Sequence, residues 1–310
     1  MKTRLSAIAL SLTLAFASQF AMAAPTVTVS QSGTGNTAAA EQSGFDPDAD
    51  VTATITQIGN NNHVGGPGGT TAGIVQATGT AAAASVTQTG AGNNAGIVQS
   101  DVGVLLPNVE IRQSGSTNSA MARQGPSSGA DIIVHQSGTS NVTTVDQAAA
   151  DSEIRVTQIG LNNNAGVSES GTDLFGVRIE QNGDGNTATA TVADNSVSNH
   201  SILQTGLRNN AVTNQFNANS SDLLIQQSGA DNHAAIGQTG VLQTATIDQN
   251  GNNNLARIDQ TGLGGTFIGN TALIAQAGNN NNGLIRQVGD GFAATVSQTG
   301  SGNYANVYQH

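Results

Sequence analysis

The stretch "IDQNGNNNLARIDQTG" (residues 247–262) contains the same tripeptide, Ile-Asp-Gln, on both sides of a run of Gly and Asn. In its first copy, Ile247 and Gln249 share one face of an extended chain, whereas Asp248 lies on the opposite face. A period of two is the pattern of a β-strand. The "NGNN" between the copies (residues 250–253) fits a tight turn, because Gly tolerates positive φ and Asn can bond its own backbone. The stretch therefore predicts a strand–turn–strand unit.

This unit recurs along the chain as Gln-x-Gly-x-x-Asn, and most successive copies begin 22 or 23 residues apart. The first Gln occurs at Gln31, Gln57, Gln88, Gln113, Gln136, Gln158, Gln181, Gln204, Gln227, Gln249, Gln276 and Gln298. The turn glycine follows two residues later, at Gly33, Gly59, Gly90, Gly115, Gly138, Gly160, Gly183, Gly206, Gly229, Gly251, Gly278 and Gly300. The Asn follows five residues after the Gln, at Asn36, Asn62, Asn93, Asn118, Asn141, Asn163, Asn186, Asn209, Asn232, Asn254, Asn281 and Asn303. A motif that recurs at a nearly fixed period indicates a repeat architecture.

A single unit cannot bury its inward face, so the copies are expected to stack into an all-β solenoid. We predict about twelve strand–turn–strand coils that form two facing, cross-β-like parallel sheets about 10 Å apart, with about 4.8 Å of rod per coil. Inward amides need hydrogen-bond partners, and stacked Gln and Asn side chains supply them to one another as ladders. A second ladder is expected on the second strand, at Gln42, Gln76, Gln99, Gln124, Gln147, Gln215, Gln238, Gln260, Gln287 and Gln309. Both ends of the rod are expected to offer unpaired strand edges.

The length variation is expected in loops near residues 43–50, 100–108 and 261–270, at the edge opposite the tight turn. A further insertion, residues 65–73, falls inside a second strand, and Gln76 keeps its register only if this insertion loops out.

Two positions break the second ladder, because Glu169 and Val192 stand where Gln is expected. An inward carboxyl would be disfavoured in its charged form. Glu169 is therefore expected either to be a pH-sensitive weak point or to be tolerated through local fraying or a shifted register.

The first 23 residues have a basic start, an apolar run and an Ala-Met-Ala end, which is the pattern of a secretory signal peptide. We predict cleavage after Ala23, a mature repeat region of residues 24–310, and no membrane span after cleavage. The mature chain would keep seven basic and 20 acidic residues, for a formal charge of −13, and would contain no Lys. Nucleic acid is therefore not an expected partner, because phosphate-binding surfaces need clustered Lys and Arg. With no Cys, the exported chain must be stable without disulfides.

No catalytic, metal or cofactor site is expected. The "GPSSG" stretch around Ser127 has the Gly-x-Ser-x-Gly spacing, but a nucleophile elbow needs a strand before it and a helix after it. His63 and His233 share an outward position but belong to distant repeats, so they do not form a metal-ligand set.

The extended motif Gln-x-Gly-x-x-Asn-x-Ala-x-x-x-Gln resembles the curlin repeat of the curli subunits of Gram-negative bacteria. The Ala matches in nine of the twelve repeats, for example at Ala120, Ala188, Ala256 and Ala305, and the final Gln is in register in nine. The resemblance covers about residues 27–310.

What the resemblance implies is a secreted functional amyloid that crosses an outer-membrane channel and polymerises on a nucleator subunit at the cell surface. Such fibres serve biofilm matrix, cell adhesion and aggregation. The nucleating subunit of the family usually has a basic terminal repeat, and the last repeat here has no Lys or Arg, which favours the major, fibre-forming role.

Three alternatives remain at this point. A nucleator or minor curli subunit would share the repeat. A soluble ice- or carbohydrate-binding solenoid would show one outward column of matching residues, whereas Thr246, Arg112, Thr157 and Glu180 vary. A polysaccharide-cleaving β-helix would need clustered Asp, Arg or His on adjacent coils.

Overall fold

The computed structural model describes residues 25–65, 73–102, 107–126, 129–148, 151–171, 175–194, 198–262 and 268–310. The expected signal peptide, Ser127, most of the insertion at 65–73 and the centres of the expected loops at 100–108 and 261–270 lie outside these residues. The described chain is all-β, with no helix in it, and consequently it contains no helix able to cross a membrane.

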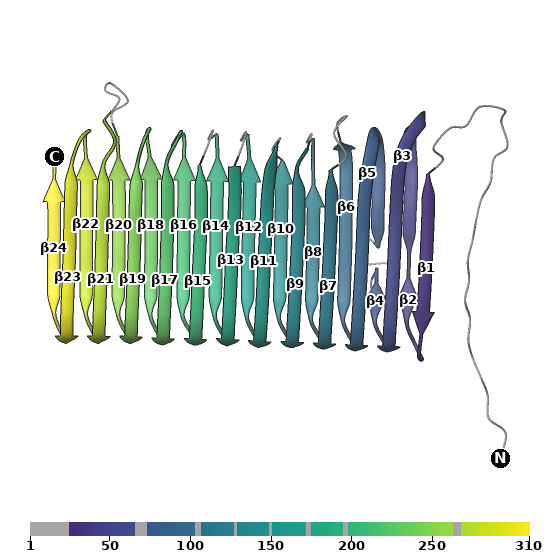
Figure 1. Ribbon diagram of the computed structural model, residues 1–310, viewed down its shortest axis with the longest axis horizontal. Helices are drawn as coiled ribbons and strands as arrows, with labels where there is room; N and C mark the ends of the chain where they lie inside the picture. The colour runs from purple at the N-terminus through teal and green to yellow at the C-terminus, as the bar shows by residue number, and fades with distance from the viewer. Residues whose placement is uncertain are drawn as a thin grey trace, which may run out of the picture.

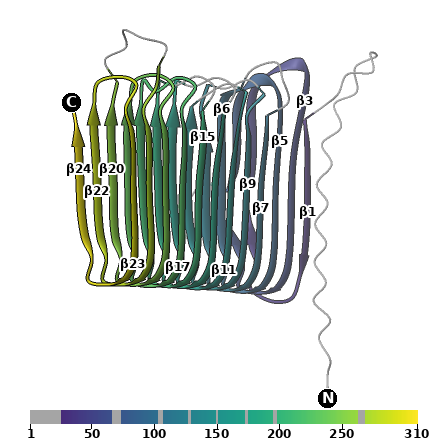
Figure 2. The same ribbon diagram turned by 60° about the vertical axis from the view of Figure 1, so that its left-hand side comes forward.

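The strands form two facing layers that are built up coil by coil along one axis (Figures 1 and 2). The early strands are β1 (Thr26–Ser32), β2 (Thr37–Ala38), β3 (Ala40–Asn60), β4 (His63–Val64), β5 (Ile74–Ala91), β6 (Asn94–Val102), β7 (Asn108–Ser116) and β8 (Ser119–Gln124). The middle strands are β9 (Asp131–Thr139), β10 (Val142–Ala148), β11 (Ser152–Leu161), β12 (Asn164–Ser170), β13 (Phe175–Asp184), β14 (Thr187–Ala193), β15 (Asn199–Leu207) and β16 (Asn210–Phe216). The late strands are β17 (Asp222–Ala230), β18 (His233–Thr239), β19 (Thr244–Asn252), β20 (Leu255–Thr261), β21 (Thr271–Asn279), β22 (Asn282–Val288), β23 (Ala293–Ser301) and β24 (Tyr304–Gln309).

From β6 on, each strand pairs in parallel with the strand two places on, so odd-numbered strands continue one layer and even-numbered strands the other. Before that, β3 and β5 each run through both layers, and the first part of β5 pairs with β6. We call the layer of first strands, from β1 to β23, the first sheet, and the layer that ends in β24 the second sheet. The pairing keeps the repeat in register: Gln136 lies opposite Gln158, and Gln158 opposite Gln181. The predicted β-solenoid of about twelve strand–turn–strand repeats with two parallel sheets is confirmed.

One of the expected loops, at residues 43–50, is not a loop in the structure. Residues 43–50 do not leave the sheet as a loop, because β3 continues through them and passes from the second sheet to the first. Ser43 and Asp50 pair with Ala77 and Ala81 of β5, and the register shifts between Phe45 and Asp50. The enlarged corners of β3 and β5 lie on each other and pair their backbone N–H and C=O groups, whereas a single enlarged loop would have no neighbour to pair with.

The core between the sheets is thin and regular. An Ile or Val lies two residues before most of the ladder Gln positions, and side chains such as Ile154, Ile179 and Ile202 are fully buried. Small residues of the facing strand, such as Ala165 and Ala188, fill the other side of the gap. Alternation along each strand is the reason: in β11 every second residue is buried and its neighbours face outward.

Candidate functional site

The first-strand glutamines form one continuous column of side-chain hydrogen bonds. In every step the Nε2 of one Gln donates to the Oε1 of the Gln in the next coil, at 2.6–2.9 Å. The other N–H reaches a backbone carbonyl of the facing sheet, as Gln158 does to Val142 at 2.9 Å. Both N–H groups and the oxygen of each internal Gln are thereby used, so these amides are buried without loss of their hydrogen bonds.

The second-strand glutamines form a similar column in two pieces. The first piece runs from Gln42 through Gln76 to Gln147, and the second from Gln215 to Gln309, with Nε2 again donating toward the C-terminal end. Gln76 keeps its place on both sides despite the insertion before it. Glu169 lies between the two pieces.

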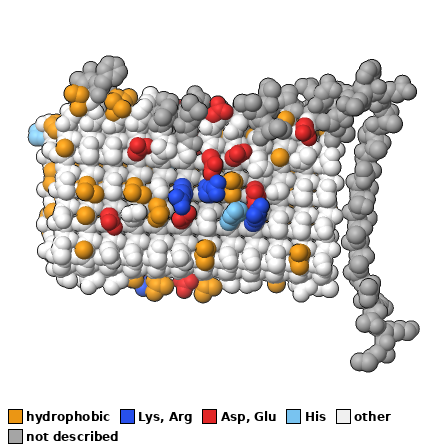
Figure 3. All heavy atoms as spheres, in the orientation of Figure 1, with side chains coloured by type: hydrophobic (Ala, Val, Ile, Leu, Met, Phe, Trp, Pro, Cys, Tyr) orange, Lys and Arg blue, Asp and Glu red, His pale blue; other side chains and the backbone are white. Residues whose placement is uncertain are grey.

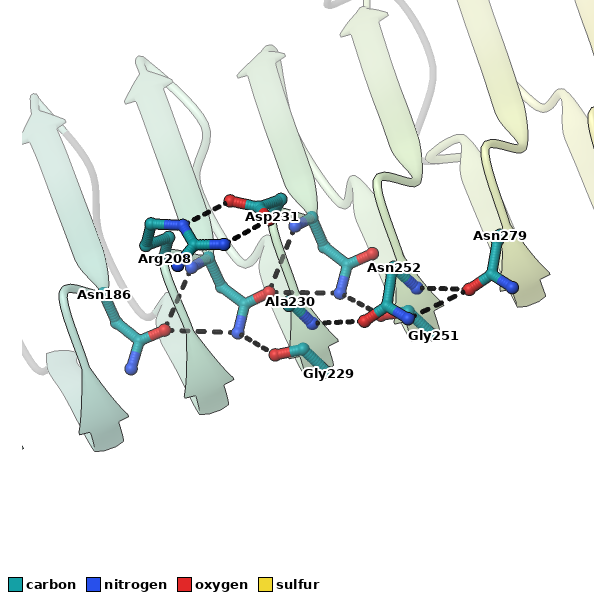
Figure 4. A network of polar contacts seen from close by, with 10 residues as sticks. Asn186, Arg208, Gly229, Ala230, Asp231, Gly251, Asn252 and Asn279 are labelled. Atoms are coloured by element: carbon teal, nitrogen blue, oxygen red, sulfur yellow. Dashed lines mark hydrogen bonds and ion pairs between the residues drawn. The ribbon is translucent and has the colours of Figure 1, made fainter.

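The turn asparagines form a third column, which has the opposite direction. The backbone N–H and the Nδ2 of each Asn donate to the Oδ1 of the Asn in the preceding coil, at 2.9–3.3 Å. In one such step Asn209 donates to Asn186, and its Nδ2 also reaches the carbonyl of Gly229 at 3.0 Å. Figure 4 shows the turns around this step, with Asn186 and Gly229 labelled. The Asn column therefore ties each tight turn to both of its neighbours.

The turn glycines are required by both backbone angle and space. Gly138 has a φ of +118°, and a Cβ placed on it would lie 2.1 Å from the carbonyl oxygen of Gly160. The same close approach recurs at each step from Gly33 to Gly278. At Gly300 the nearest atom is the Nδ2 of Asn303, at 3.7 Å, because no described coil follows it.

Outside the columns, the turns carry polar contacts that vary from coil to coil. Asn252 Oδ1 accepts the N–H of Ala230 at 3.0 Å, and Arg208 makes two hydrogen bonds to Asp231 in the next coil (Figure 4). This ion pair lowers the pKa of the Asp231 carboxyl. Both side chains are exposed, so it contributes little to stability.

The outward charges of the first sheet lie in its middle (Figure 3). Arg155 pairs with Glu153 of the same strand at 2.9 Å, and Arg112 and Arg178 each pair with a glutamate of their own strand. Asp131 lies beside Glu153 in the stack. Burial, and to a smaller extent the like charge of Glu153, raise the pKa of Asp131, whereas the hydrogen bond from the Asn108 backbone N–H lowers it. By contrast, β1, β5, β21 and β23 carry no charged residue, and β3 carries none from Val51 to its end in the first sheet. The charges are thus kept away from both ends of this sheet.

At each end of the stack, the outer side of each column has no partner among the residues that the structure describes. At the β1 end, the Oε1 atoms of Gln31 and Gln42 accept no hydrogen bond from described residues. At the β24 end, the Nε2 of Gln298 and of Gln309 each donates one N–H to a backbone carbonyl. The second N–H of each has no acceptor among the described residues. Among the described strands, none pairs with the outer edge of β1 or of β23 (Figure 1).

Sequence reasoning did not single out several buried polar groups, three of which matter below. His200, Thr213 and Ser152 occupy inward positions and are almost fully buried. Their inward direction could have been inferred from the period of two, because His200 stands four residues before Gln204. No group of three or more His, Cys, Asp or Glu side chains suited to a metal ion occurs in the part of the chain that the structure describes.

Stacked coils with continuous amide columns define a parallel β-solenoid of short strand–turn–strand repeats. The Curlin associated repeat model matches residues 26–52, 128–160 and 229–262, and the chain belongs to the curlin-repeat family. A search of curated proteins gives no match. The family is structural rather than enzymatic, and its members are typically extracellular or cell-surface proteins of Gram-negative bacteria.

Proposed function

We propose that this protein is a secreted structural subunit that polymerises end to end into extracellular, curli-like amyloid fibres. The observation that carries the proposal is the complementarity of the two ends. The β1 end offers the Oε1 acceptors of Gln31 and Gln42, and the opposite end offers the Nε2 donors of Gln298 and Gln309.

The junction would repeat the internal contacts. When β23 of one copy pairs with β1 of the next, Gln298 can donate to the next copy's Gln31, as Gln276 donates to Gln298 at 2.7 Å within the chain. The Asn column closes in the opposite direction, with Asn36 of the next copy donating to Asn303. Two identical ends would instead bring acceptor against acceptor or donor against donor. The arrangement therefore favours head-to-tail growth, which is the heterologous contact that produces open filaments.

Electrostatics support the same junction. The chain is acidic, with a formal charge of −11, so random contacts between copies are repulsive. The first-sheet strands that would meet at the junction are uncharged. Electrostatic repulsion between two copies is therefore smallest when they meet at these ends of the sheet.

The finer roles follow from the family. Fibres at the cell surface would contribute to biofilm matrix, adhesion and aggregation. A nucleator subunit and an outer-membrane secretion channel are the proposed partners, and we assign the chain the major, fibre-forming role.

The test compares two lysine variants of β24. Val307→Lys would enclose a charge at the junction, because Val307 faces the core, whereas Asn306→Lys leaves the charge on the exposed face. We expect Val307→Lys to prevent elongation and Asn306→Lys to keep it, since inward charges block strand addition. Thioflavin fluorescence, electron microscopy and fibre diffraction at about 4.7 and 10 Å report assembly. If the wild-type chain stays monomeric, or if both variants elongate equally, the proposal is wrong.

A further inference from the structure

The second-sheet column changes its chemistry in the middle of the stack. Gln147 Nε2 donates to a carboxylate oxygen of Glu169 at 3.3 Å, where elsewhere it would meet an amide. The next coil places Val192 in the column, and the coil after that returns to Gln215. All four residues keep the regular strand register. The fraying or register shift expected at Glu169 does not occur.

The Glu169 side chain is buried and accepts hydrogen bonds from two neighbouring side chains. The side chain is only 2% exposed, and Ser152 Oγ donates to its Oε1 at 2.6 Å in addition to the bond from Gln147. Both carboxyl oxygens of Glu169 thus accept a hydrogen bond. The first piece of the column therefore ends on an acceptor at Glu169.

His200 begins the second piece. It lies on β15 at an inward position, in register with Val177 on one side and Leu223 on the other, and it is 1% exposed. Its Nε2 contacts the Oε1 of Gln215. An amide oxygen can only accept, so Nε2 carries the proton and donates. His200 thus supplies the hydrogen bond that a Gln in place of Val192 would have given.

We propose that the coils from Glu169 to Gln215 form an acid-labile break point, at which protonation of His200 lets the stack open internally. A protonated ring has two donors and a full charge in a position that Val177 and Leu223 otherwise keep apolar. Of the groups on the packed strands, Val177 of β13, Val192 of β14 and Gln215 of β16 carry no charge, whereas Asp222 of β17 acts electrostatically on the ring. The carboxyl group of Glu169 on β12 lies in the same column as Val192 and Gln215. Opening would leave two shorter stacks, each with a free strand edge.

The direction of the pH effect follows from burial. Desolvation lowers the pKa of His200 to about 4, against the opposing effects of the Gln215 contact and of Asp222. An opened coil would titrate near the ordinary value of about 6.5. As the pH falls from about 6.5 to about 4, the opened form therefore takes up a proton that the closed form does not, and opening becomes on the order of a hundred-fold more favourable. Above pH 7 the effect is absent.

The test is hydrogen exchange with mass spectrometry on the full chain at pH 7.0, 5.5 and 4.5, corrected for intrinsic exchange rates. In the wild type we expect protection of β12 to β16 to fall tenfold or more in acid, with smaller changes in β6 to β8 and β20 to β22. His200→Gln keeps an N–H donor and cannot take up the proton, so its β12 to β16 protection should be independent of pH. His233→Asn is the matched control: it removes an exposed histidine from β18 and should behave as the wild type.

If His200→Gln does not fold, the triple variant Glu169→Gln, Val192→Gln, His200→Leu restores a continuous column and should also lose the acid response. Protection that falls evenly along the stack, or an unchanged acid response in whichever of these variants folds, would overturn the proposal. The measurement needs no fibre, so its outcome is separate from the outcome of the polymerisation test.

Discussion

The glycine of each tight turn is the residue for which the stack has the least tolerance. Gly138 combines a φ of +118° with a space too small for a methyl group, because the carbonyl of the next turn glycine fills it. Gly166 of β12 is different: it has no positive φ, and a Cβ there would meet nothing within 4 Å. Two glycines of one chain therefore have opposite requirements.

This contrast gives a prediction for stability. Gly138→Ala should lower the free energy of unfolding by about 3–5 kcal/mol, because backbone strain adds to an enforced shift of two stacked turns. Gly166→Ala should raise it by about 0.5–1 kcal/mol, because Ala restricts the unfolded chain in a conformation that it readily adopts. Urea titrations followed by circular dichroism measure both values. Equal effects of the two substitutions would show that the turn does not approach its neighbour closely.

At the scale of the element, each strand–turn–strand unit holds its register through contacts that do not depend on the connecting segments. The insertion after Val64 illustrates this point. The chain re-enters the sheet at Gly73, which lies beside Ala39 and whose carbonyl oxygen accepts the N–H of Ile97 at 2.9 Å. Val64 and Ile74 keep the register of the coils before and after. The strand is therefore complete without the inserted residues.

Deletion of residues 65–72 should consequently be tolerated. Joining Val64 to Gly73 restores the regular spacing from Asn62 to Gln76, so we expect the far-ultraviolet spectrum to be unchanged and the urea midpoint to be equal to or higher than that of the wild type. Removal of residues 65–73 serves as the control, because the loss of one further residue would turn the side chains of β5 to the wrong face. A cooperative, wild-type-like transition in this control would contradict the register argument.

The elements were predictable because period and spacing are local properties. Alternation placed Gln158 and Ile154 inward, and the fixed distance from Gln158 to Asn163 predicted the tight turn. The direction of the hydrogen bonds was not predictable, since Nε2 and Oε1 of a Gln can exchange places and only the whole column fixes their orientation. The contact of His200 with Gln215 also depends on how the two sheets face each other across the core, which no single strand records.

At the scale of the whole molecule, the columns give the rod a direction. The Gln columns donate toward the β24 end and the Asn column donates toward the β1 end, so the two ends differ chemically. The glycine turns have a direction too, because a Cβ on each would strike the carbonyl of the following coil. A fibre built from such rods head to tail would keep this direction along its whole length.

Gly300→Ala should therefore act as a chain terminator. Within the variant chain the new Cβ meets only Asn303 Nδ2 at 3.7 Å, so the variant can fold, although its φ of +106° costs about 1–3 kcal/mol. Its β1 end is unaltered and can add to the β24 end of a growing fibre. Its own β24 end would then hold a methyl group about 2 Å from the carbonyl of the next copy's Gly33, since each internal Cβ would lie 1.9–2.1 Å from such a carbonyl.

Added to the wild type at one part in ten, the variant should shorten the fibres seen by electron microscopy and stop growth at one end of seeds. Ser301→Ala, on an exposed turn residue, is the matched control and should leave fibre length unchanged; shortening by both variants, or by neither, would contradict growth through this glycine contact.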